Sequence, residues 1–151
     1  MYDDILVPTD GGANVDRVVD HALDIAERRD ARVHALYVVD TRSFLTLADD
    51  TKEDVVAELR ADGERATADV TDRATEAGLE STAEIRRGDP AEVVLDYLFE
   101  TDVDLVTMGT HGERDQRTML GSVAQAVVEK STTPVLTVPV DDRASLEEPT
   151  G

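Results

Sequence analysis

The chain has 151 residues, a length typical of one domain that buries a hydrophobic core of its own. It contains no cysteine, which excludes a disulfide framework, thiolate catalysis and cysteine metal ligands, and only 3% of its residues are aromatic. Its formal net charge of −19 argues against nucleic-acid binding, and no segment has the apolar length of about 18 residues that a membrane-spanning helix needs.

The first predicted elements are a buried strand, an amphipathic helix and a second strand. The start, MYDDILVPTD, is acidic and runs directly into the apolar triplet ILV, unlike a secretory signal, so residues 3–9 are predicted as a strand of a cytoplasmic protein. Gly11–Gly12 form a turn, and apolar residues at helical spacing predict a helix that ends near Arg29. Residues 32–39 are almost continuously apolar, as expected of a strand covered on both faces.

A loop and a long helix come next. Residues 40–50 form a polar-flanked loop that either packs its own apolar tip or covers a ligand. A helix is predicted from about Thr51 to Ala77, with Gly78 as its C-terminal stop. Gly63 lies inside this helix, where glycine costs about 1 kcal/mol relative to alanine, and it allows a kink or break.

The second half of the chain repeats the alternation. Residues 80–87 have the pattern of a half-exposed edge strand, and Asp89 and Pro90 are predicted as the N-cap and first residue of a helix that ends near Thr101. A strand at 103–108, a helix at 122–130 and a strand at 134–140 complete the domain. The acidic tail, residues 141–151, is expected to be flexible.

This alternation predicts an α/β fold: a single doubly wound, Rossmann-like or flavodoxin-like domain over residues 1–140, with a five-stranded parallel sheet. The usual strand order, 3-2-1-4-5, has its switch point between strands one and four, where such sheets bind ligands. The turns at 8–12 and 109–122 should therefore meet, which brings Asp10 beside the second turn.

The second turn is rich in glycine. Gly109, Gly112 and Gly121 are followed by Ser122 in the spacing G-x2-G-x8-G-S, between a buried strand and the start of a helix. Glycines let a ligand approach the backbone, N–H groups at a helix start favour an anion, and the serine adds a donor. The pattern predicts a site for a phosphorylated ligand. The alternatives are tight-turn geometry without a ligand, and a serine that only caps the helix.

Five motifs in order carry a resemblance to the universal stress protein family. They are DDILVPTD, LYVVD, RGDP, MGTHG…LGS and STTPVLTVP, and they cover residues 1 to about 140. The resemblance implies a Rossmann-like fold, ATP or a related adenine nucleotide as ligand, and dimers that pair through the last strand. An apolar edge strand at 134–140, flanked by Pro134 and Pro139, would need such cover.

The resemblance also implies roles for particular residues. Asp10 would face the ribose and adenine, although it has an alternative role as a turn residue or cap. Val38 would hold the adenine through its main chain. The whole set implied to bind nucleotide is Pro8, Thr9, Asp10, Val38, Met108, Gly109, Gly112, Gly121, Ser122 and Val123.

This loop departs from the family pattern in two ways. The family usually has nine residues between the second and third glycines, and this chain has the eight residues 113–120. Ala124 stands where ATP-binding members often have a hydroxyl. Within the loop, two acidic residues oppose two arginines. The loop therefore predicts weakened binding, a preference for fewer phosphates, or loss of binding.

Other polar residues give weaker signals. His111, between two glycines, is interpreted as solvent-facing rather than as a catalytic base. His21 and His34 lack ligand spacing, so no zinc site is predicted. Asp40 contacts the ribose or turns the loop. The 34 acidic residues against 15 basic ones favour adaptation to a salt-rich, archaeal cytoplasm over binding of basic partners, because the charge is spread along the chain.

The sequence thus favours a cytoplasmic, homodimeric sensor or regulator that binds ATP, with Mg²⁺ as a candidate companion. One alternative is a protein-interaction member of the same fold without a nucleotide. Another is a slow ATPase, although the chain has neither a G-x-x-x-x-G-K-[ST] loop nor G-x-G-x-x-G.

Overall fold

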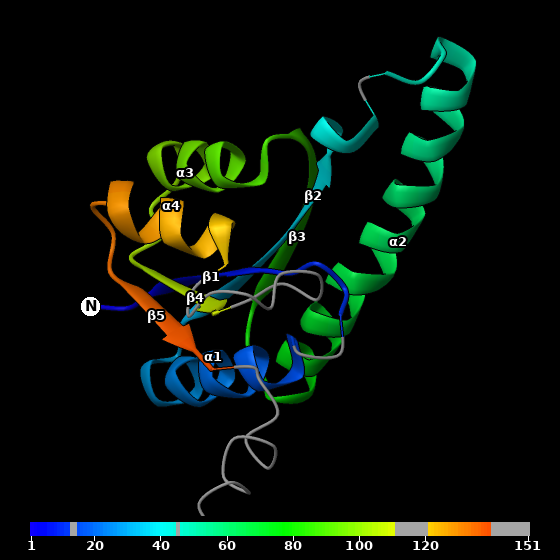
Figure 1. Cartoon of the computed structure of the whole chain (residues 1–151). Helices are drawn as coiled ribbons and strands as arrows, with labels where there is room; N and C mark the ends of the chain where they lie inside the picture. The colour runs from blue at the N-terminus through cyan, green and yellow to red at the C-terminus, as the bar shows by residue number, and fades with distance from the viewer. Residues whose placement is uncertain (13–14, 45, 111–120, 140–151) are drawn as a thin grey trace, which may run out of the picture.

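The computed structural model describes residues 1–12, 15–44, 46–110 and 121–139. Its centre is a five-stranded sheet of parallel strands in the order β3-β2-β1-β4-β5 (Figure 1). This order confirms the fold predicted from the sequence. The strands are β1 (Asp4–Pro8), β2 (Arg32–Asp40), β3 (Ser81–Gly88), β4 (Leu105–Gly109) and β5 (Val135–Val138).

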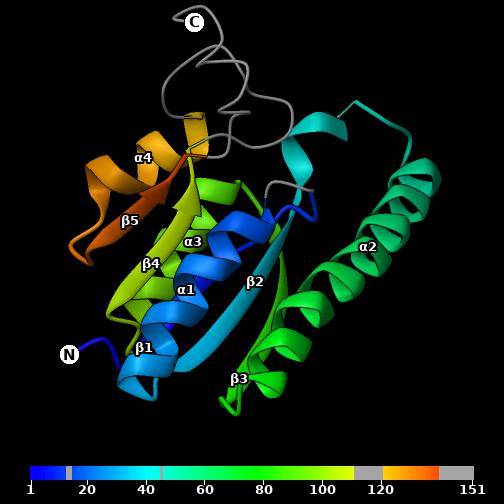
Figure 2. The ribbon, with the colours of Figure 1, turned by 90° about the horizontal axis from the view of Figure 1, so that it is seen from below.

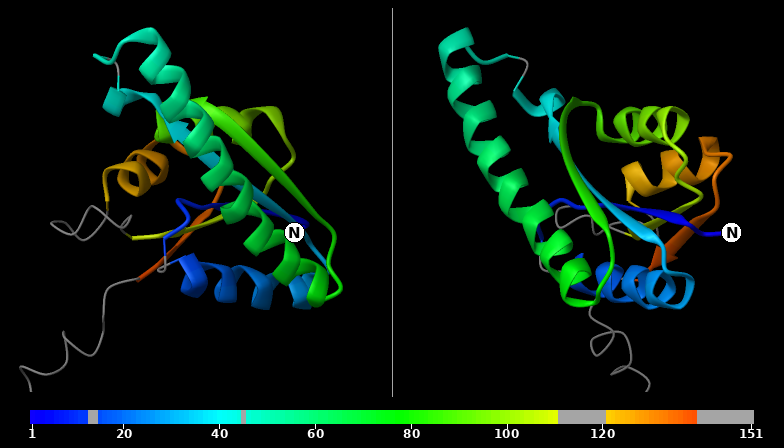
Figure 3. Two further views of the ribbon diagram at one scale, coloured as in Figure 1. Left: turned by 90° about the vertical axis from the view of Figure 1, so that its right-hand side faces the viewer. Right: turned by 180° about the vertical axis from the view of Figure 1, so that it is seen from behind.

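Four α-helices cover the two faces of this sheet. They are α1 (Val15–Arg29), α2 (Asp49–Glu76), α3 (Pro90–Glu100) and α4 (Ser122–Lys130), and a short 3₁₀ helix, η1, spans Thr41–Phe44. The core clusters place α1 and α2 on one face and α3 and α4 on the other, as Figures 1 and 2 show. The part of α2 near its N-terminus extends beyond the sheet (Figure 3).

Strand β1 contributes to both core layers. Ile5 and Val7 pack with α1 and α2, whereas Leu6 faces the other way and packs with α3 and α4. All three side chains are 0% exposed. The apolar triplet predicted as a buried strand is therefore the central strand of the sheet, and its neighbours β2 and β4 are apolar for the same reason.

The outer strand β3 is less buried, as its alternating sequence predicts. It pairs with β2 from Val33↔Ser81 to Asp40↔Gly88. Ile85 packs against the cluster under α2, whereas Ala83, two residues earlier on the strand, is exposed. No further strand covers the outer side of β3 in the described sheet, so β3 is an edge strand, as predicted.

The helix ends follow the local sequence signals closely. Asp89 is the N-cap of α3 and accepts hydrogen bonds from the N–H groups of Ala91 and Glu92, with Pro90 as the first helical residue. Gly78, at φ +78°, follows α2, a conformation that favours glycine. Helix α2 starts two residues earlier than predicted, and β5 is shorter than the predicted 134–140. Leu47, from the loop at 40–50, is exposed rather than packed.

Gly63 does not break α2, contrary to one possibility left by the sequence. The helix is continuous, and the aromatic ring of Tyr37 on β2 packs against the Gly63 backbone. A Cβ at this position would lie 2.5 Å from Cδ1 of Tyr37. The glycine therefore permits close approach of helix and sheet.

We expect Gly63→Ala to lower the free energy of unfolding by about 1–3 kcal/mol, the range for overpacking a filled core, despite the better helix propensity of alanine. Thermal or urea unfolding measures this change. In a Tyr37→Leu background the ring is gone, so the same alanine should raise stability. Equal effects of the alanine in both backgrounds would contradict the contact.

Candidate functional site

The candidate site lies at the carboxyl edge of the sheet, where β1 and β4 end side by side. Ile5 pairs with Leu105 and Leu6 with Val106. Continuing this register by two positions brings Pro8 opposite Met108. The switch point between strands one and four is thus where the sequence predicted it, and the turns that follow β1 and β4 leave the sheet as neighbours.

The turn after β1 is held by its own side chains. The Thr9 N–H donates to the Leu36 carbonyl at 2.8 Å, which ties the turn to β2. The Thr9 hydroxyl accepts from the Gly11 N–H at 3.1 Å, and the Asp10 carboxylate accepts from the Gly12 N–H at 2.8 Å. Gly11 has φ +79°, which a glycine adopts without strain. Asp10 is therefore a turn residue, and its exposed carboxylate lies at the site's edge.

The two described ends of the glycine-rich loop meet. The Gly121 N–H donates to the Thr110 carbonyl, and the Thr110 N–H donates to the Val138 carbonyl at 3.0 Å. Helix α4 begins directly afterwards, with Gly121 as its N-cap and Ser122 as its first residue. The suggestion that Ser122 itself is the N-cap is therefore wrong. Residues 111–120, which include His111 and Gly112, lie outside the described residues.

The apolar members of the predicted site share one core cluster. Val38, Met108 and Val123 pack in the layer between the sheet and helices α3 and α4. Met108 is buried, whereas Val38 and Val123 are partly exposed. Ala124 is also buried in this cluster, at 4% exposure. A hydroxyl in place of its methyl group would need a buried partner, which explains why a small apolar residue suits this position.

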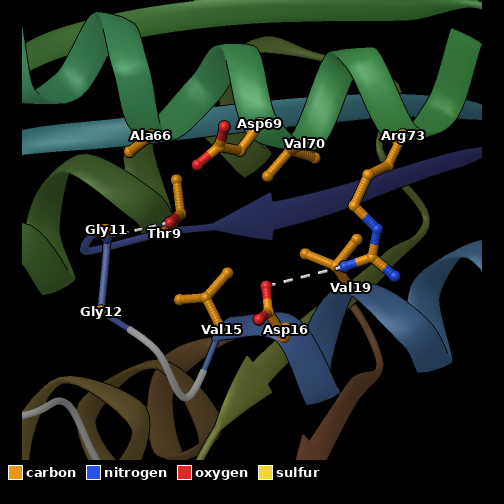
Figure 4. Close-up of a pocket in the computed structure, with 10 residues that line it drawn as sticks. All are labelled: Thr9, Gly11, Gly12, Val15, Asp16, Val19, Ala66, Asp69, Val70 and Arg73. Atoms are coloured by element: carbon orange, nitrogen blue, oxygen red, sulfur yellow. Dashed lines mark hydrogen bonds and ion pairs between the residues drawn. The ribbon is translucent and has the colours of Figure 1, made fainter.

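Behind the first turn lies a small cavity, of about 30 Å³, between α1 and α2 (Figure 4). It has room for little more than a water molecule, so it is not a nucleotide pocket. Arg73 of α2 lines it and pairs with Asp16 at 3.8 Å and with Asp20. The remaining lining residues are Thr9, Gly11, Gly12, Val15, Val19, Ala66, Asp69 and Val70. Residues of both α1 and α2 thus face the turn across this cavity.

Charged side chains gather where β2 and β3 end. Arg42 donates to Asp40 from Nη2 at 2.8 Å and from Nε at 2.9 Å. Its Nη1 lies 3.4 Å from the Asp89 carboxylate. The Arg42 hydrogen bond holds the pKa of Asp40 below its usual value, against the opposing effect of partial burial. Burial, together with the charges of Asp62 and Asp10, raises the pKa of Tyr37. Sequence reasoning missed this Arg42 cluster, because Arg42 and Asp89 are far apart in the chain.

A different polar group lies at the opposite, amino edge of the sheet. His34 is 9% exposed, with Nε2 at 2.9 Å from the Asp4 carboxylate and Nδ1 at 2.7 Å from the Tyr97 hydroxyl. It borders an open acidic hollow of about 480 Å³. Among the described residues, no group of three or more His, Asp or Glu is arranged to hold a metal ion. This network joins β1, β2 and α3 and does not form part of the switch-point site.

Comparison with known proteins identifies the family. The model of the universal stress protein family matches residues 1–139. This chain belongs to the universal stress protein family. It is 35% identical over 140 residues to universal stress protein MJ0531 of Methanocaldococcus jannaschii, covering 91% of this chain and 82% of that protein.

Solved universal stress proteins share the fold. The structure of MJ0577, from the same archaeon, superposes with a TM-score of 0.85 at 25% identity, covering 94% of this chain and 99% of that one. A universal stress protein solved in complex with cAMP gives a TM-score of 0.72 at 27% identity, covering 93% of this chain and 99% of that one. No described helix of this universal stress protein is long and apolar enough to cross a membrane.

The lowered pKa of Asp40 has a consequence for stability. A carboxyl whose pKa is depressed by folding stabilises the protein above its unfolded pKa, about 3.9, and loses that contribution as the pH falls through its folded pKa. Asp40→Asn should therefore destabilise the protein at pH 7 by about 0.2–1 kcal/mol, the range for a solvent-screened pair. Urea unfolding from pH 7 to pH 3 should show this difference shrinking below about pH 4. A difference independent of pH would contradict the pairing.

Proposed function

We propose that this protein binds an adenine nucleotide, ATP in the first place and Mg²⁺ with it, at the carboxyl edge between β1 and β4. It would act as a homodimeric sensor or regulator in a salt-rich cytoplasm. The observation that carries the proposal is the convergence at the switch point of the Pro8–Asp10 turn, Gly109 and the Gly121–Ser122 start of α4. Chemically distinct parts of a nucleotide need such separate contacts.

The start of α4 supports the phosphate end of this proposal. Gly121 is the N-cap and has no side chain with which to cap the helix. The first N–H groups of a helix lack intrahelical partners, and the helix dipole favours an anion there. Helix α3 differs, because the Asp89 carboxylate already occupies its N-terminus. Of these two helix starts at the carboxyl edge, α4 is thus the one that suits a phosphate.

In the proposed site, Val38 and Asp10 would contact the adenine and the ribose. Val38 lies near the end of β2, with its side chain in the same cluster as Met108 and Val123. This apolar floor suits the face of a base, and the exposed Asp10 carboxylate suits ribose hydroxyls. The relative solved with cAMP, also an adenine nucleotide, supports the ligand class. Gly112 belongs to the proposed site as well, although it lies outside the described residues.

Calorimetry with ATP and Mg²⁺ at multimolar KCl tests the proposal. Gly121→Val places a branched side chain beside the phosphate-facing N–H groups, and Asp10→Ala removes the ribose contact. Each should weaken ATP binding about tenfold or more, because a lost charged or close contact is worth about 1.4 kcal/mol or more. Asp96→Ala, on the exposed face of α3, is the matched control and should bind as wild type.

Two results would contradict this proposal in different ways. Absence of heat from the wild-type protein at millimolar ATP would refute nucleotide binding and favour a protein-interaction member of the fold. Equal ATP affinity in wild type, Gly121→Val and Asp10→Ala would refute the site. Hydrolysis is not part of the proposal, and an ATPase assay is expected to stay at background.

The homodimer is proposed through β5, the strand at the end of the sheet order. Val135 and Leu136 remain partly exposed on it, although each packs against one core layer. An apolar edge strand invites pairing with a second copy. Because the proposal concerns strand pairing, it is independent of nucleotide binding.

Leu136→Lys should convert the dimer to a monomer, since it introduces a charge into the paired edge. Light scattering or native mass measurement gives the oligomeric state, and circular dichroism checks that the monomer is folded. Thr132→Lys adds the same charge at an exposed position before β5 and should leave the dimer intact. A folded Leu136→Lys protein that stays dimeric would rule out this interface.

A further inference from the structure

We propose that Arg42 is a positioning residue of the nucleotide site, which fixes Val38 by tying the end of β2 to the first turn of α3. This inference rests on the proposed function, because it takes Val38 as the residue that faces the base. It concerns selectivity for adenine, which the proposed function leaves unexplained.

The first contact in this link is a bidentate hydrogen bond from Arg42 to Asp40. Arg42 donates from Nε to Oδ1 at 2.9 Å and from Nη2 to Oδ2 at 2.8 Å. Its backbone N–H donates to the same Oδ1 at 3.0 Å. Such a planar fork fixes the direction of the guanidinium as well as its distance. The turn from β2 into η1 is thereby held in one shape.

The second contact in this link joins Arg42 to Asp89, the N-cap residue of α3. Nη1 of Arg42 lies 3.4 Å from Oδ2 of Asp89. The other oxygen of the same carboxylate, Oδ1, accepts from the N–H groups of Ala91 at 3.0 Å and Glu92 at 3.4 Å. Asp89 therefore uses its two oxygens for two purposes, and the α3 cap is linked to the end of β2.

Packing also associates Val38 with the first turn of α3. Ala91 and Val93, in the first turn of α3, are 9% and 8% exposed and belong to the same core cluster as Val38. The corner between β3 and α3 is also tight, because a Cβ on Gly88 would lie 3.0 Å from Cγ2 of Val93. Val38 thus shares a core cluster with the first turn of α3, and Asp40, two residues after Val38, is linked to the α3 cap through Arg42.

Arg42 is better suited to this role than to binding phosphate. Its side chain is 51% exposed, but two carboxylates, those of Asp40 and Asp89, already face the guanidinium. The hydrogen bond to Asp40 raises the pKa of Arg42, with burial acting in the opposite direction. A cation matched by two anions adds little net attraction for a phosphate, and the start of α4 belongs to another part of the edge.

The expected effect is on the base, not on the phosphates. Adenine and guanine differ in the donors and acceptors along one edge, and a main-chain group discriminates between them only when it is well positioned. Loosening the end of β2 should therefore weaken ATP binding while leaving GTP binding unchanged. A merely structural role would weaken both nucleotides alike.

The test is calorimetric titration of ATP and GTP into variants of the full chain. R42Q removes the guanidinium, and D89S keeps a side chain that caps the helix while losing the carboxylate that Arg42 contacts. We expect R42Q to reduce the ratio of ATP to GTP affinity by up to about fivefold, as for loss of a solvent-screened pair, with D89S changing it in the same direction. R28Q, which removes the exposed Arg28–Asp24 pair on α1, is the control for charge and should keep the wild-type ratio.

The outcomes separate this inference from the proposed function. Wild-type protein that binds no ATP overturns the proposed function and this inference together. Wild-type binding with an unchanged ATP to GTP ratio in R42Q and D89S overturns the inference alone, as does an equal loss for both nucleotides. If R42Q does not fold, R42K takes its place: it keeps the charge but not the fork, so its ratio should fall below wild type, and an unchanged ratio again overturns the inference.

Discussion

The structure depends on the complete burial of β1 between two layers of helices. Ile5, Leu6 and Val7 alternate between the layers and none is accessible to solvent. A strand buried on both faces needs a hydrogen-bonded neighbour on each side, because unpaired backbone groups within the core would be unsatisfied. Strands β2 and β4 meet this need and run in the same direction from opposite sides of β1. The switch point at the carboxyl edge follows from this arrangement, since the chain leaves β1 and β4 toward opposite layers.

Electrostatics then divides that edge into two parts. On the side of β2 and β3, carboxylates cap α3 and pair with arginine, so positive charge is already matched. On the side of β4, α4 begins at a glycine. In a chain with a net charge of −19, an anionic ligand is repelled at long range, and only short-range donors or a bound cation can offset this repulsion. High salt weakens this long-range repulsion much more than it weakens the short-range contacts.

Several features were predictable because local sequence determines them. The cap at Asp89, the stop at Gly78 and the bounds of α4 each depend on residues within one helical turn, and the structure has them as predicted. The strand order was predictable from the alternation of elements and the handedness of crossovers.

Contacts between distant residues were not predictable from the single sequence. Arg42 and Asp89 are 47 residues apart, and neither has an unusual local pattern that signals the other. The same holds for His34 and Tyr97, 63 residues apart, whose interaction needs β2 and α3 to be placed first. Gly63 was misleading for a related reason. The penalty for glycine within a helix depends on local sequence, whereas the ring that packs against this glycine belongs to Tyr37 on strand β2. The nucleotide-binding roles of the site residues stay predictions.

The contact between Tyr37 and Gly63 also limits how this sequence can change over time. An aromatic ring at position 37 leaves room only for glycine at position 63, so the two positions cannot vary independently. A relative with a larger residue on the helix should carry a smaller one on the strand, and the intermediate with both large residues would be selected against. Position 37 directly precedes Val38, a residue of the proposed nucleotide site. The two residues are therefore expected to covary across the family.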